Sequence, residues 1–178
     1  MTREGRPVGC LCASAGAWRR VGDGGRPESA GLHAPCLVRS GLGKGEPELT
    51  YAELDLHVRA LAAELMERGA ARERVLLLLP PGLDYVVALY AVLAAGAVAV
   101  PAYPSRPGRS NRSLEGIIAD ARASIAIVNA SPRPGSAEAQ SGISVVIMGD
   151  VDPRRADEWR RPRLRRDQLA MLQYTSGS

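Results

Sequence analysis

Beyond residue 48, apolar side chains recur at helical spacing in some stretches and form short unbroken runs in others. The first helical stretch predicts a helix over residues 50–68, because its leucine and valine side chains share one side. Those side chains are Leu54, Val58, Leu61 and Leu65. Thr50 and Glu53 have the spacing of a capping box, in which each side chain accepts a hydrogen bond from the other residue's backbone N–H. Gly69 favours the end of this helix.

Five short apolar runs are typical of strands that are buried on both faces of a sheet. They are residues 74–79, 97–100, 125–128, 143–148 and 169–174. Helical spacing returns between the first three runs, over residues 83–95 and again after a cap at Asn111 or Ser113. Residues 131–142 are polar, contain proline and are predicted to be a loop. Strands that alternate with helices indicate an α/β fold with an open, mostly parallel sheet and flanking helices.

The chain divides into two parts near residue 46. Residues 1–46 are rich in Gly, Arg, Ala, Pro and Ser and show no sustained period, so we predict that they are disordered or poorly packed. Residues 47–178 contain all the predicted helices and strands. They are therefore expected to form a single folded unit.

The cysteines give no sign of a metal site or a disulfide framework. All three lie in the first segment, as Cys10, Cys12 and Cys36, and their spacing with His33 fits no common zinc pattern. His57 is interpreted as a boundary residue of the first helix. We therefore predict no metal ligands, and this cysteine usage suits a reducing, cytoplasmic location.

Positive charge is unevenly distributed along the chain, which has a net charge of +4 and a pI of about 9.3. The excess lies in residues 3–26 and 154–166, and Trp159 is the one aromatic residue of the second stretch. Nucleic-acid binding needs a basic surface on folded structure, so we interpret the second stretch as a solvated loop and predict no nucleic-acid partner. The apolar residues 86–100 are fewer than the ~20 needed to cross a membrane, and Gly96 interrupts them. We predict no membrane span.

The last predicted strand leads into a turn of small residues, Thr175, Ser176, Gly177 and Ser178. Small residues let backbone N–H groups and hydroxyls surround an oxyanion, so this turn is typical of the start of a phosphate site. From these four residues alone, however, a frayed polar terminus is the favoured interpretation. No carboxylate pair or nucleophile with a base stands out along the chain, so we assign no catalytic residue.

Four segments together resemble adenylate-forming enzymes, and most of all the fatty acyl-AMP ligases. Residues 173–178, QYTSGS, resemble the opening of the family's phosphate loop, which continues there as Thr-Gly-x-Pro-Lys-Gly. Residues 100–107, VPAYPSRP, resemble the proline loop of fatty acyl-AMP ligases, with Ser105 where a second proline is common. Such a loop at the carboxyl end of a parallel strand is where open sheets bind ligands. Residues 49–51 and 79–84 match in the same order and spacing.

The resemblance covers residues 49–178 and implies the first part of the large N-terminal domain of such an enzyme, truncated inside its phosphate loop. The complete enzyme would use ATP and Mg²⁺ to activate a fatty acid as an acyl-adenylate and transfer it to an acyl carrier protein. That activity serves lipid metabolism and polyketide or nonribosomal peptide biosynthesis. Thr175, Ser176, Gly177 and Ser178 would begin the loop that binds the β- and γ-phosphates. Because the rest of the loop and the later domains are missing, we expect this chain to be inactive and to bind no nucleotide stably.

Other functions fit parts of the pattern. The chain could belong to an acyl-CoA ligase or an amino-acid adenylation domain, or be a nonenzymatic binding remnant. A dinucleotide-binding module would need a glycine fingerprint after the first strand, and residues 80–84, PPGLD, do not provide one. A remnant that binds nucleic acid through its arginines would show steeply salt-dependent binding.

Overall fold

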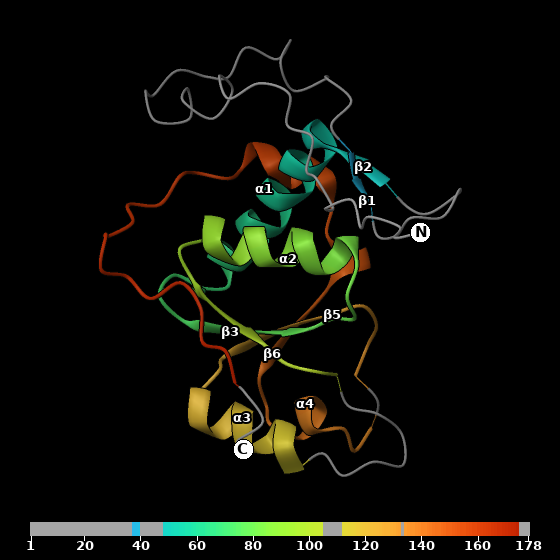
Figure 1. The fold of residues 1–178 in the computed structure, drawn as a ribbon, viewed down its shortest axis with the longest axis vertical. Helices are drawn as coiled ribbons and strands as arrows, with labels where there is room; N and C mark the ends of the chain where they lie inside the picture. The colour runs from blue at the N-terminus through green and yellow to red at the C-terminus, as the bar shows by residue number, and fades with distance from the viewer. Residues whose placement is uncertain (1–36, 40–47, 105–111, 133, 175–178) are drawn as a thin grey trace, which may run out of the picture.

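The computed structural model describes residues 37–39, 48–104, 112–132 and 134–174. Within these residues, one sheet lies between two layers of helices (Figure 1). The helices on one face are α1 (Tyr51–Glu67) and α2 (Leu83–Ala94), and those on the other are α3 (Arg112–Ala121) and α4 (Ala137–Gln140). This arrangement confirms the predicted α/β fold.

In the described part of the chain, this sheet has four parallel strands in the order β4-β3-β5-β6. Their bounds are β3 (Arg74–Leu78), β4 (Val98–Pro101), β5 (Ile125–Val128) and β6 (Ser144–Ile147). The chain passes from β3 to one side to form β4, and then to the other side of β3 to form β5. The strand order therefore reverses at the β3–β5 pair. The prediction of an open, parallel sheet is confirmed.

A second, antiparallel pair joins β1 (Leu37–Arg39) to β2 (Glu48–Thr50). Strand β1 falls inside the segment 1–46 that was predicted to be disordered or poorly packed. The other residues of that segment, including Cys10, Cys12 and Cys36, lie outside the described residues. The domain boundary near residue 46 stays a prediction.

Helix α1 begins and ends as its sequence predicts. The backbone N–H of Thr50 donates to Glu53 Oε2 at 2.8 Å, and the Glu53 N–H donates to Thr50 Oγ1 at 3.2 Å, which completes the capping box. Gly69 follows the helix with φ of 75°, a left-handed conformation that glycine adopts without steric cost. In α3, Ser113 lies inside the helix and is therefore not its cap, while Asn111 lies outside the described residues.

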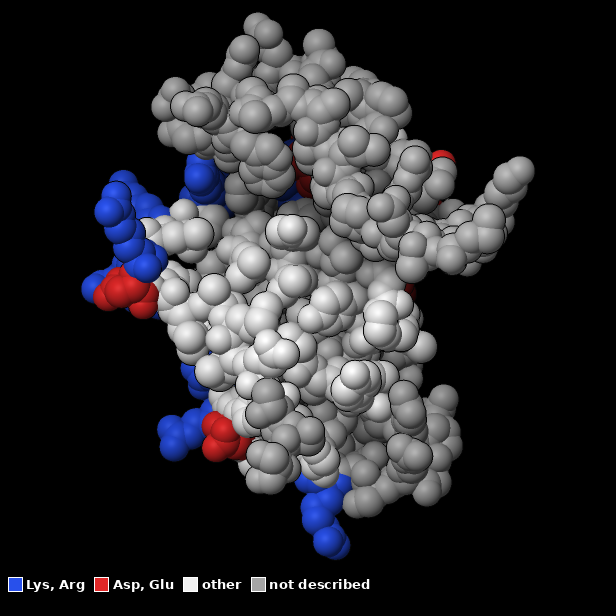
Figure 2. All heavy atoms as spheres, viewed as in Figure 1, with Lys and Arg blue, Asp and Glu red and all other residues white. Residues whose placement is uncertain are grey.

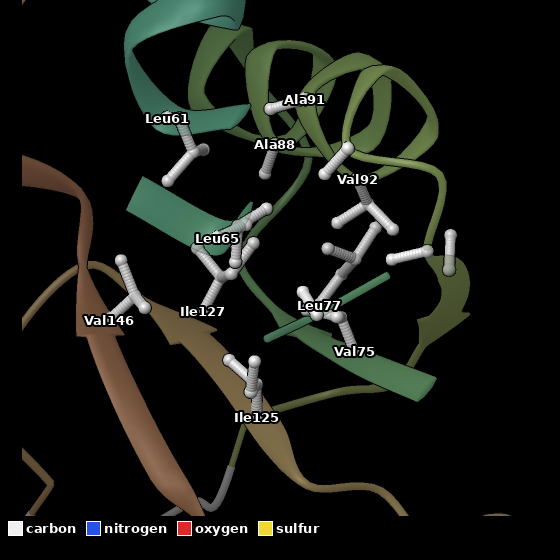
Figure 3. Packing of buried hydrophobic residues seen from close by; sticks show 14 of the residues in the cluster. Leu61, Leu65, Val75, Leu77, Ala88, Ala91, Val92, Ile125, Ile127 and Val146 are labelled. Carbon is white, nitrogen blue, oxygen red and sulfur yellow. The ribbon is translucent and has the colours of Figure 1, made fainter. Parts of the chain in front are cut away.

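The strands divide the core into two clusters, because successive side chains of a strand point to opposite faces. Val75 and Leu77 of β3 point toward α1 and α2, where they pack with Leu61 and Leu65 (Figure 3). Leu76 belongs to the opposite cluster, together with side chains of α3. Both faces of the sheet are thus covered, as a parallel sheet requires.

The connector after β6 differs from the predicted solvated loop. It contains the 3-10 helices η3 (Met148–Asp150) and η4 (Pro153–Asp157), and Ala156 of η4 is buried. Arg155 forms ion pairs with Glu64 and Glu67 of α1. The solvated-loop prediction was wrong for η4. The acidic partners of Arg155 lie on α1, far away in the sequence, and a run of arginines does not indicate such partners.

The segment 131–142 also departs from the loop that was predicted there. It contains the short helix α4, which Ser136 caps by accepting a hydrogen bond from the backbone N–H of Ala139 at 3.3 Å. Ala137 is buried in the cluster under α3. A serine with one buried alanine is too weak a pattern to predict a helix from sequence.

Candidate functional site

The candidate site lies where the four parallel strands bring their carboxyl ends to one edge of the sheet. The loops there begin at Leu79 after β3, Ala102 after β4, Asn129 after β5 and Met148 after β6. Open parallel sheets bind ligands beyond this edge. Two places along this edge are described below. The first is at the outer side of β4, and the second is at the β3–β5 pair, where the strand order reverses.

On the first side, the last described segment lies along β4. The Ala99 N–H donates to the Ala170 carbonyl at 2.9 Å, and the Leu172 N–H donates to the Ala99 carbonyl at 2.8 Å. These bonds form one parallel bridge, between Ala99 and Met171, where a full strand over residues 169–174 was predicted. The bridge is nevertheless parallel to β4, so the chain runs toward the carboxyl edge as it reaches Tyr174.

Tyr174 is attached to helix α3 at this point. Its hydroxyl donates a hydrogen bond to Asp120 Oδ2 at 2.5 Å, and its ring packs against the buried cluster that contains Leu114 and Ile118. The hydrogen bond to Asp120, followed by desolvation and the charge of Asp120, raises the pKa of the Tyr174 phenol above its ordinary value. Sequence reasoning missed this contact, because no local pattern links two residues 54 positions apart.

The four residues predicted to bind phosphate, Thr175, Ser176, Gly177 and Ser178, lie outside the described residues. The structure therefore describes the segment that leads to them. The predicted loop after β4 starts beside this segment. Its first residue still pairs with β3, because the Ala102 N–H donates to the Leu77 carbonyl at 3.2 Å.

On the second side, a pocket of about 640 Å³ opens where the strand order reverses. Its lining comes from Leu49 of β2, from α1 and the start of α2, and from the segments that follow β3, β5 and β6. Most of the lining is apolar, and its polar side chains are His57, Asp84 and Asn129. The lining contains no Ser, Thr or Cys that could act as a nucleophile. The pocket can hold an apolar group but provides no constellation for catalysis.

The described residues also bear on metal binding and on membrane insertion. They contain no cluster of three or more His, Cys, Asp or Glu side chains that could hold a metal ion. Among them there is also no helix that is long and apolar enough to cross a membrane.

The arginines of the connector do not make a uniformly basic surface. Arg154 pairs with Asp152 and Arg165 with Asp167. These contacts lower the pKa of both carboxyl groups, mainly through the arginine side-chain hydrogen bonds. Figure 2 shows blue and red side chains next to each other at the edge of the molecule. This mixture of charges gives no support to binding of a nucleic-acid backbone.

A comparison with protein families identifies the family to which this chain belongs. The sequence model of a family described as AMP-binding enzyme matches residues 28–178. The chain belongs to the AMP-binding enzyme family. The match includes the segment with Tyr174 and the four predicted phosphate-binding residues after it.

Two similar AMP-binding proteins are named as fatty-acid ligases. JamA of Moorena producens, a medium-chain-fatty-acid–[acyl-carrier-protein] ligase, is 39% identical over 150 residues, which cover 77% of this chain and 25% of JamA. The putative fatty-acid–CoA ligase fadD25 of Mycobacterium tuberculosis is 34% identical, with 75% of this chain and 24% of fadD25 covered.

A solved structure supports the same relationship. The crystal structure of fatty acyl-adenylate ligase from L. pneumophila, in complex with acyl adenylate and pyrophosphate, matches with a TM-score of 0.67 and 32% identity. The match covers 77% of this chain and 25% of the L. pneumophila chain. The present AMP-binding chain thus spans about a quarter of the length of the relatives it matches.

Proposed function

We propose that this chain is the first part of a ligase that activates a fatty acid as an acyl-adenylate and transfers the acyl group to an acyl carrier protein. The observation that carries the proposal is the 39% identity to JamA, whose name states a fatty acid and an acyl carrier protein. The four-stranded parallel sheet and the direction of its last segment are compatible with that chemistry.

One segment of the chain suits a nucleotide's phosphates by its sequence. The segment paired with Ala99 directs the chain toward the carboxyl edge of the sheet, and Thr175, Ser176, Gly177 and Ser178 follow it in sequence. Their backbone N–H groups and hydroxyls would hold the β- and γ-phosphates of ATP. ATP would supply the adenylyl group and Mg²⁺ would neutralise phosphate charge. We assign no described residue as a metal ligand.

The chain by itself should not catalyse adenylation. Stabilising the charge that develops at the α-phosphate requires donors on several sides of the nucleotide, and the relatives contain about three times as much additional chain. The test is ATP–pyrophosphate exchange with the purified 178-residue protein. Exchange that depends on a fatty acid would disprove the expected inactivity.

The activity is tested on the complete ligase that contains these residues. Fatty acids of several chain lengths are supplied with ATP, and acyl-adenylate and pyrophosphate are measured. Holo acyl carrier protein and coenzyme A are then offered in separate reactions. We expect fatty-acid-dependent exchange and acyl transfer to the carrier protein, with little acyl-CoA.

A second candidate acceptor is coenzyme A. The observation that favours it is the similarity to fadD25, a putative fatty-acid–CoA ligase that is 34% identical to this chain. Acyl-CoA formation in place of acyl transfer to the carrier protein would select this candidate. Exchange with amino acids would select an amino-acid adenylation domain, and no exchange with any acid would leave a nonenzymatic binding role.

A further inference from the structure

Helix α2 is apolar on the side that faces away from the core. Its buried side consists of Val87, Ala88, Ala91 and Val92. Val86, Tyr90 and Leu93 lie on the opposite side, at the i, i+4 and i+7 spacing that forms one stripe along a helix. Tyr90 is 52% exposed, and Val86 and Leu93 are half-buried. We call these three residues the α2 stripe.

The α2 stripe lacks the charged residues that a water-facing helix normally carries. Residues 85–94 contain no Asp, Glu, Lys or Arg, whereas the neighbouring helix α1 exposes Glu53, Asp55 and Glu67. Among the described side chains, Figure 2 shows white ones, without blue or red, over the region where Figure 1 shows α2. Such a face is typical of a surface that another part of a protein covers.

The sheet also has an open edge, beside β4. Met171 forms the bridge to Ala99, and the two bonds of this bridge use the Ala170 carbonyl and the Leu172 N–H. The Met171 N–H and carbonyl therefore point away from β4, and within the described residues they form no hydrogen bond. Met171 and Leu172 pack in opposite core clusters, as successive residues of a sheet strand do. An edge of this kind can accept a further strand.

The α2 stripe and the open edge lie on the same side of the sheet's strand order, next to β4. Leu164 lies against Gly96, at the end of α2. Gln168 Nε2 donates to the Gly96 carbonyl at 2.7 Å, directly before the edge at residues 170–172. Leu164 is 57% exposed and Leu169 is 50% exposed, so apolar surface extends from the end of α2 toward this edge.

We propose that the α2 stripe and the open edge at Met171 form one interface, whose occupant is a later segment of the complete ligase. That segment adds a strand beside Met171 and places apolar side chains over Tyr90. The inference rests on the proposed function, since it needs the chain to be the first part of a longer ligase.

Two arguments favour this occupant over a second copy of the chain. The chain spans about a quarter of the length of its relatives, so the complete ligase has ample chain to cover this surface. A segment joined after residue 178 would also be tethered close to Met171 in sequence. Tethering gives it a higher effective concentration at the interface than a separate partner has.

The first test measures the reactivity of a thiol placed in the α2 stripe. Tyr90→Cys is introduced into the 178-residue protein and into the complete ligase, each with its native cysteines replaced by serine, and modification by a maleimide is timed. We expect the thiol to react about tenfold more slowly in the complete ligase, because a covered thiol reacts only after local opening. The control is Arg154→Cys, at a side chain that is 90% exposed, which should react at similar rates in both proteins.

The second test measures amide hydrogen exchange of Met171 in proteins labelled with [15N]methionine. The 178-residue protein contains four methionines, and the Met171 signal is assigned by its loss in Met171→Leu. We expect this amide to exchange about fivefold more slowly in the complete ligase, the scale of one added hydrogen bond. The Met66 amide, inside α1, is the internal control and should be protected in both proteins.

The outcomes separate the occupants. Slower modification of Tyr90→Cys together with slower Met171 exchange in the complete ligase supports the interface with a later segment. Equal rates in the two proteins at either position overturn it. Protection that is already present in the 178-residue protein also overturns it, and a dimer in sedimentation would then assign the surface to a second copy.

The same measurements separate the interface from the proposed function, because neither requires catalysis. A complete protein that shows both protections but no fatty-acid-dependent exchange of ATP with pyrophosphate overturns the proposed function and supports the interface. An active ligase without the protections supports the proposed function and overturns the interface.

Discussion

The two faces of the sheet are covered in different ways. One face carries α1 with 17 residues and α2 with 12, and the connector closes over them through Arg155 and Trp159. The other face carries α3 with 10 residues and α4 with 4. There, the side chains of Leu172 and Tyr174 from the last described segment complete the packing. Figure 1 shows the two layers on opposite sides of the strands.

This difference means that the two faces should affect different properties, namely the stability of the fold and the position of the last described segment. The face under α1 and α2 is packed by long helices and by the ion pairs of Arg155. The face under α3 and α4 depends on the residues directly before that turn. Damage to the first face should therefore change mainly the free energy of unfolding, whereas damage to the second should also move the segment that leads to Thr175.

The largest effect on the free energy of unfolding is expected from a cavity in the core. Strand β3 offers two adjacent leucines for a matched comparison of the two faces. Leu76 and Leu77 are neighbours with 0% exposed surface and point to opposite faces. We expect Leu77→Ala to reduce the free energy of unfolding by about 4 kcal/mol and Leu76→Ala by about 3 kcal/mol, since the shorter helices can collapse further into the cavity. Urea denaturation measures both. Equal losses, or a larger loss for Leu76→Ala, would contradict the comparison.

The next effect concerns the attachment of the connector to α1. Arg155 is 21% exposed, and it contacts Glu64, which is 17% exposed, and the more exposed Glu67. Arg155→Ala should cost about 2 kcal/mol, because it leaves the Glu64 charge with less compensation in a half-buried place. Arg154→Ala is the control, since Arg154 is 90% exposed and pairs with Asp152. We expect it to change stability by less than about 0.5 kcal/mol.

The sequence predicted the elements whose signals are local. The capping box of α1 lies within four residues, and the buried runs of β3, β4 and β5 are visible as unbroken apolar letters. It did not predict the packing of η4 on α1, because Arg155 and Glu64 are 91 positions apart. An arginine run has the same local composition whether its partners are water or a distant helix.

The candidate site shows the same limit. Direction of the last segment followed from the alternation of strands and helices, and the parallel bridge at Ala99 agrees with it. The link between Tyr174 and Asp120 depends on how α3 packs, which no periodicity specifies. The phosphate-binding role of residues 175–178 came from family resemblance, since four small polar residues do not distinguish a phosphate turn from a chain end.

A smaller effect is expected at the start of α1. The Thr50 hydroxyl accepts a hydrogen bond from the Glu53 N–H, and removal of such a cap costs about 1 kcal/mol. Thr50→Ala should therefore lower stability by that amount in urea denaturation, and Thr50→Ser should restore most of it. No change in Thr50→Ala would mean that packing under α1 alone fixes the end of the helix.

The same cap has a pH dependence. Hydrogen bonds from the Thr50 backbone and then its side chain lower the pKa of Glu53 below its ordinary value of 4.5. A lowered folded-state pKa gives stability that is present above pH 4.5 and lost as the pH falls through the folded-state value. The loss of stability on acidification should therefore be smaller in Glu53→Gln than in the wild type.

The smallest effect concerns the face under α3 and α4. It is a loss of stability as the pH rises, whereas the Glu53 contribution is lost as the pH falls. The hydrogen bond to Asp120 raises the Tyr174 pKa above its ordinary value of 10.0. The contact therefore contributes stability below that value and loses it as the pH rises through the folded-state pKa, when the phenolate can no longer donate a proton to a carboxylate. Phenolate absorbance should therefore show a late-titrating component from Tyr174. Tyr174→Phe should remove this late component and Asp120→Ala should shift it to lower pH, whereas Tyr90→Phe should leave it unchanged. A late component that persists in Tyr174→Phe would assign it to another tyrosine, and the second face would then not depend on the Asp120 bond.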